Sequence, residues 1–155
     1  MTRTLAALAA SAAALAAAAS AQMTASQAVL TETVTVDPQG REVVTTAPAT
    51  DVVPGDRVAY VLTYANEGAA PAEDLVLVMP VPASVTLLAG TEDGGTPEHS
   101  ADGGATFGAL PDLTVVEDGQ ARPATPADVT HIRWRLASAV QPGATGEVSY
   151  RAILR

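Results

Sequence analysis

The chain has 155 residues, and its formal net charge is −9 because seventeen Asp and Glu outweigh eight Arg, with no Lys present. This acidity disfavours nucleic acid and anionic lipid surfaces as partners, since both carry negative charge. The chain has no Cys, so it can form neither a disulfide nor a thiolate metal or redox site.

Residues 1–21 have the composition of a secretory signal peptide. Arg3 precedes an apolar, Ala-rich run over residues 5–19, and Ala19-Ser20-Ala21 places small residues where a signal peptidase cleaves. We predict cleavage after Ala21, which leaves 134 residues from Gln22 and changes the formal charge from −9 to −10. The run is shorter than the about 20 strongly apolar residues of a membrane span. We therefore expect an exported protein, periplasmic or at the cell surface, with no membrane span after signal cleavage.

The exported part begins with β-forming sequence. Residues 29–36 are dense in Val and Thr and predict a first strand. Asp37-Pro38-Gln39-Gly40 predicts a turn, after which residues 41–46 can return as a short strand. Residues 57–65 show the clearest alternation of the chain. Two further strands are expected at residues 75–79 and 85–88, the first of them ended by Pro80 and Pro82.

The second half of the chain changes character twice. Residues 90–128 are rich in Gly, Asp, Glu, Pro and Thr, and we expect long loops with short hairpins there. Residues 130–136 predict a half-buried strand with Trp134 on the core face, and residues 146–154 predict the last strand. Seven to nine short strands without an amphipathic helix favour an all-β, immunoglobulin-like antiparallel β-sandwich, formed by residues 22–155 as one domain.

One part of this pattern resembles a known family. Pro54-Gly55-Asp56, an alternating strand and then Asn66-Glu67-Gly68 resemble the opening of the bacterial conserved repeat domain, catalogued as domain of unknown function 11. The likeness continues through residues 72–82 and through Trp134 and Pro142-Gly143 to the last strand. The resemblance implies an immunoglobulin-like sandwich in an exported or surface protein, present here in a single copy, and it implies no activity.

A smaller likeness lies at residues 100–107, where Ser-Ala-Asp-Gly-Gly-Ala-Thr-Phe is similar to the Asp-box hairpin of sialidases and other β-proteins. In such a hairpin the carboxylate of Asp102 accepts backbone N–H groups and holds the turn. That role is structural, so the likeness predicts no glycosidase.

The titratable residues do not predict an enzyme. His99 lies in a Gly-rich segment and His131 lies beside Arg133, and no Gly-x-Ser-x-Gly elbow is present. Two such distant His are also a poor zinc signature.

Calcium is the cofactor that the composition makes conceivable, because carboxylates crowd the loops of residues 90–118 and Ca²⁺ prefers oxygen ligands. The candidate ligands are Glu92, Asp93 and Asp102, and the alternative is an acidic loop in contact with water.

Arg133 and Arg135 allow two interpretations. They form either a pair that binds an anionic sugar or peptide, or cross-strand ion pairs with neighbouring acids.

The function expected from these features is that of a non-catalytic structural or adhesive module of the cell envelope. It would act by binding an envelope protein or glycan, or by self-association, because the segment at residues 29–36 can pair with its own sheet or with a neighbour's. The alternative is a module that binds calcium or a small ligand in its acidic loops. An enzyme is the least favoured class.

Overall fold

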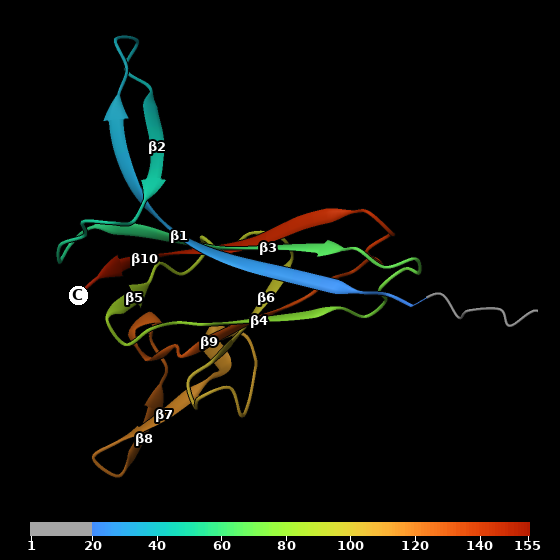
Figure 1. The fold of residues 1–155 in the computed structure, drawn as a ribbon. Helices are drawn as coiled ribbons and strands as arrows, with labels where there is room; N and C mark the ends of the chain where they lie inside the picture. Colours follow the sequence, from blue (N-terminus) through green and yellow to red (C-terminus); the bar gives the residue numbers. More distant parts are fainter. Residues whose placement is uncertain (1–19) are drawn as a thin grey trace, which may run out of the picture.

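A computed structural model describes residues 20–155, so most of the predicted signal peptide, residues 1–19, lies outside the described residues. The described chain is built from antiparallel strands, with two single-turn 3₁₀ helices, η1 (Leu110–Asp112) and η2 (Pro126–Asp128). It contains no helix long and apolar enough to cross a membrane. The prediction of an all-β antiparallel sandwich is confirmed (Figure 1).

The strands form two sheets that face each other and one separate hairpin. The larger sheet contains β1 (Met23–Val36), β2 (Glu42–Pro48), β3 (Arg57–Asn66), β5 (Val85–Leu87) and β10 (Thr145–Leu154), in the order β2-β1-β3-β10-β5. The smaller sheet contains β4 (Val76–Pro80), β6 (Thr96–Ser100) and β9 (His131–Arg135), in the order β4-β9-β6. The hairpin contains β7 (Thr114–Glu117) and β8 (Gln120–Pro123).

The core lies between the two sheets, and in β9 and β10 it follows the predicted alternation. Trp134 of β9 and Tyr150 of β10 are fully buried, and Tyr150 stacks on Tyr60 of β3 with 4.8 Å between ring centroids. The Tyr150 hydroxyl donates a hydrogen bond to the Pro80 carbonyl oxygen at 2.7 Å, which ties the larger sheet to β4. Burial, together with the neighbouring Tyr60, raises the pKa of Tyr150 well above its ordinary value of 10, so this donor stays protonated.

One prediction about a strand was wrong. Residues 96–100 were expected to belong to the loop-rich region, but they form β6, which pairs with β9 along its whole length. The prediction that the strand over residues 75–79 ends at Pro80 is confirmed, since Pro80 is the last residue of β4 and lies opposite His131. Both β4 and β6 are edge strands, so Pro80 and Pro97 can each turn their missing N–H away from the ladder.

The first strand is longer than predicted and has two partners. Residues 23–31 of β1 pair with β3, and residues 30–36 pair with β2 on the other edge. Beyond the sandwich, β1 and β2 continue as a two-stranded ribbon that projects from the molecule, as Figure 1 shows. We call residues 32–48 the arm.

Asn66 anchors the far end of β3. Its side-chain amide is fully buried, and Nδ2 donates to the carbonyl oxygens of Ala70 and Val140 at 2.8 Å each. Oδ1 accepts the N–H of Gly68 at 3.0 Å and that of Gln22 at 3.3 Å. One side chain thereby satisfies four polar groups from three segments of the chain.

We expect Asn66→Ala to lower the free energy of unfolding by about 2–4 kcal/mol, because it leaves several partly buried backbone groups without partners. Urea unfolding followed by tryptophan fluorescence measures this, since the single Trp lies in the core. Thr63→Ala, at an exposed position of the same strand, is the control and should cost less than about 1 kcal/mol. Equal losses for the two variants would contradict the anchoring role of Asn66.

Candidate functional site

The three predicted calcium ligands do not converge. Glu92 Oε1 contacts His99 Nε2 at 2.6 Å, Asp93 Oδ1 accepts the N–H of Gly94, and Asp102 holds a separate hairpin. Across residues 20–155, no group of three or more His, Asp or Glu side chains is arranged to hold a metal ion. Calcium binding therefore stays a prediction without geometric support.

Asp102 is placed as the Asp-box likeness predicts. Its Oδ1 accepts the N–H of Thr106 at 2.9 Å and the hydroxyl of Ser100 at 2.7 Å, while Oδ2 accepts the Thr106 hydroxyl at 2.6 Å. These bonds, those from Thr106 first, hold the pKa of Asp102 well below its ordinary 3.8. The carboxylate is an internal acceptor of its own turn.

Glu92 and His99 form a buried pair between the sheets. Glu92 follows β5, and His99 lies on the inner face of β6; their side chains are 2% and 9% exposed. Burial alone would raise the pKa of Glu92, but the hydrogen bond and charge of His99, with nearby backbone donors, bring it below its ordinary 4.5. The other ring nitrogen of His99, Nδ1, is buried without a hydrogen-bond partner among the described residues.

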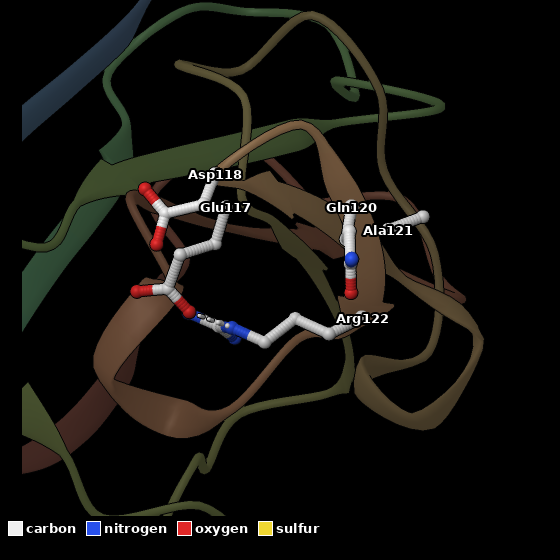
Figure 2. Close-up of a pocket in the computed structure, with 5 residues that line it drawn as sticks. All are labelled: Glu117, Asp118, Gln120, Ala121 and Arg122. Carbon is white, nitrogen blue, oxygen red and sulfur yellow. Dashed lines mark hydrogen bonds and ion pairs between the residues drawn. The ribbon is translucent and has the colours of Figure 1, made fainter.

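A shallow hollow of about 380 Å³ lies on the β7–β8 hairpin, and Figure 2 shows its lining. Its only cationic group is Arg122, which is already paired with two carboxylates. Nε donates to Glu117 at 2.6 Å, and the two terminal nitrogens donate to the two oxygens of Asp128 at 2.8 and 2.9 Å. The hollow therefore offers no unpaired cation to an anionic ligand.

Arg133 and Arg135 of β9 form cross-strand ion pairs, the second of the two interpretations that the sequence allowed. The Nε atoms of Arg133 and Arg135 both donate to Glu98 Oε2 of β6, at 2.8 and 3.1 Å. The guanidinium of Arg133 also lies 4.2 Å from the ring centroid of Phe107. Hydrogen bonds from Arg133 first, and from Arg135, lower the pKa of Glu98, so this outer face is a cross-strand ion-pair ladder.

The arm exposes valines that no contact with the sandwich covers. All seven residues of β2 are exposed, and Val34, Val36 and Val44 are 43%, 68% and 51% exposed. Val34 lies directly opposite Val44. Because side chains alternate along a strand, these three valines share one face of the ribbon.

The outer edge of β2 also carries unpaired backbone groups. Asp37 N–H donates to Arg41, and Ala49 N–H donates to Val29, at the two ends of the ladder. Bonded and non-bonded pairs alternate in an antiparallel ladder, so Val43, Thr45 and Ala47 bond to β1. The N–H and C=O groups of the residues between them point outward, and these residues are Glu42, Val44 and Thr46.

Sequence reasoning identified the two strands of the arm but not that their valines would be exposed. The signal available was the near absence of alternation: residues 29–36 and 41–48 carry β-branched residues on both faces. Such a pattern is typical of a strand whose two faces have similar surroundings, and here both faces meet solvent.

We expect Glu92→Gln to destabilise the protein by about 1.5–3 kcal/mol near neutral pH, because it removes a buried hydrogen bond to a charged group. Since the folded-state pKa of Glu92 lies below 4.5, its carboxylate stabilises the fold above about pH 4.5, and this contribution is lost as the pH falls through the lower folded-state pKa. Urea unfolding at several pH values should show the two proteins converging in acid. Asp93→Asn, at an exposed neighbour, is the control; a pH-independent gap would contradict the pairing.

No family model, curated protein or solved structure matches this chain. The resemblance to the bacterial conserved repeat domain thus stays a prediction from the residues that carry it. The arm is the candidate site.

Proposed function

We propose that this chain is an exported, non-catalytic module of the cell envelope that binds protein through its arm. The observation that carries the proposal is the exposed outer edge of β2, with its outward backbone groups and its neighbouring valine face. An extended polypeptide can add to such an edge as a further strand, with backbone hydrogen bonds giving affinity. A protein partner suits this edge better than a glycan, because the edge offers a regular array of backbone donors and acceptors.

Two features support a binding role for the arm. First, the arm contributes no residue to the hydrophobic core, so core packing does not account for its valines. Second, its base is fixed rigidly to the sandwich, because Arg151 Nε donates to the buried Glu32 Oε1 at 2.6 Å. A ribbon fixed at its base and exposed along its length holds its edge in one direction, accessible to a partner.

The predicted cleavage site is compatible with this fold. Ser20 O accepts the N–H groups of Ala69 and Ala70, and these bonds would be lost on cleavage after Ala21. The next contacts would remain, since Gln22 O accepts the N–H of Glu67 and β1 begins at Met23. The sandwich and the arm both lie within the exported part.

Export is tested by the N-terminus of the protein recovered from the cell envelope or the medium. Intact-mass analysis should find a chain that begins at Gln22. Ala21→Arg should block cleavage, because the site requires small residues, whereas Ala21→Gly should be processed normally. Recovery of chains that retain Met1, all in the cytoplasm, would contradict export.

The binding role is tested in cells with a photo-crosslinking amino acid at Val44. We expect defined protein adducts at Val44 and few at Val116, which is 75% exposed but lies on the β7–β8 hairpin. The paired change Val34→Lys and Val44→Lys should preserve the thermal unfolding midpoint and abolish adducts formed from a crosslinker at Val36. Equal labelling at Val44 and Val116 would remove the support for the arm as the binding site.

A further inference from the structure

The outer edge of β2 is a strand edge that lacks the usual protection. The edge strands β4 and β6 have five residues each and contain Pro80 and Pro97, and β5 has three residues. Short length and proline are the usual means by which edge strands avoid pairing with other chains. In contrast, residues 42–47 of β2 run without proline, without a bulge in their register and without a Lys.

The sequence of this edge is complementary to itself. If two copies of β2 run antiparallel with Val44 opposite Val44 of the second copy, then Glu42 lies opposite Thr46 and no like charges meet. In this register Glu42, Val44 and Thr46, whose backbone groups point outward, form the three bonded pairs. Each such pair exchanges two hydrogen bonds, so about six bonds join the two edges.

The side chains favour the same register. Val34 lies opposite Val44 within each arm, so the pairing produces one continuous row of four valines across four strands. A register shifted by two residues would set Val44 opposite Thr46 and Glu42 opposite Pro48, which breaks this row. Adjacent valines remove more apolar surface from water than Val–Thr pairs do, because the Thr hydroxyl is polar.

The projection of the arm reconciles this pairing with the charge of −9. Pro48 marks the base of each arm, and in the Val44-centred register it lies opposite residue 40 of the second copy. The two bases are therefore separated by eight residues along the strand, which is roughly 27 Å at about 3.4 Å per residue. This exceeds the Debye length of about 8 Å at physiological ionic strength, so the repulsion between the two acidic sandwiches is largely screened.

We propose that two copies of this chain pair through the outer edges of β2, antiparallel and with Val44 opposite Val44 of the second copy. The product is a four-stranded sheet of order β1-β2-β2-β1, with a two-fold axis between the two copies. This inference rests on the proposed function, because it names the partner of the same arm.

The absence of Cys makes disulfide trapping a direct test. In the proposed register the Cα atoms of the two Val44 residues lie about 5.5 Å apart, within the range of about 4.4–6.8 Å that a disulfide spans. Val44→Cys should therefore form a reducible dimer under mild oxidation at least 10-fold faster than Val116→Cys. Equal rates for these two matched, exposed positions would overturn the proposal.

The register is tested by two further variants. The two Thr46 residues would lie roughly 13 Å apart, so Thr46→Cys alone should not cross-link. A mixture of Thr46→Cys and Glu42→Cys should cross-link, because these positions face each other. Faster trapping of Thr45→Cys than of Val44→Cys would overturn the proposed register.

Val44→Pro tests the pairing without a disulfide. Its missing N–H is one that points away from β1, so the arm should persist while the central bonds between the copies are lost. Sedimentation equilibrium of the purified protein should show dimerisation weakened at least 10-fold, with Val44→Ile as the control that retains it. Weakening by Val44→Ile equal to that by Val44→Pro would overturn the proposal, and an unchanged melting temperature for Val44→Pro verifies its fold.

Failure of this inference and failure of the proposed function give different results. If the crosslinker at Val44 captures a different envelope protein and the purified chain stays monomeric at all concentrations, the second copy is the wrong partner but the arm still binds protein. If Val44 yields neither homodimer nor other adducts above the Val116 level, both proposals fail.

Discussion

The pairing requirement of backbone N–H and C=O groups determines how β1 is used. β1 has fourteen residues, and β3 covers only its first nine, so the remainder must find another partner or stay open. Leu30 and Thr31 pair on both edges, with β3 on one side and β2 on the other. At this junction the chain leaves the sandwich: β2 pairs with one edge of β1 from Leu30 onward, and the edge that faced β3 is open from Glu32 onward.

An ion pair with a buried carboxylate fixes the junction. Glu32 is the first residue past the contact with β3, and its carboxylate bonds to Arg151 of β10 while its second oxygen has no partner among the described residues. A buried carboxylate is costly unless it is paired, so the arm cannot swing freely without separating Glu32 from Arg151. The direction of the arm is thus tied to β10, the strand next to β3 at the centre of the larger sheet.

The sequence predicted the parts of the fold in which alternation and burial coincide. β9 places Trp134 in the core as expected, because a period-2 pattern reports a sheet with one buried face. β6 escaped prediction because its ladder with β9 comes from tertiary pairing and its sequence includes Pro97. The calcium prediction for the acidic loops lacks support for a similar reason. The carboxylates are close together in the sequence, but in the fold Asp102 and Glu92 each bond to a different local partner. The candidate site, the outer edge of β2, is defined by the lack of a neighbouring strand in the fold. The local sequence of a strand does not show whether a neighbour pairs with it.

The separation of the arm from the core has a consequence for its dynamics. Two-stranded ribbons are marginally stable in water, and beyond Glu32 this one is held by little besides its own ladder and the turn in which Asp37 accepts the N–H groups of Gln39 and Arg41. The arm is therefore a subglobal unit whose opening costs much less free energy than unfolding of the sandwich, and its amides exchange with solvent accordingly. Any strand that adds to it spends part of its binding energy on suppressing this opening, which makes contacts through the arm readily reversible.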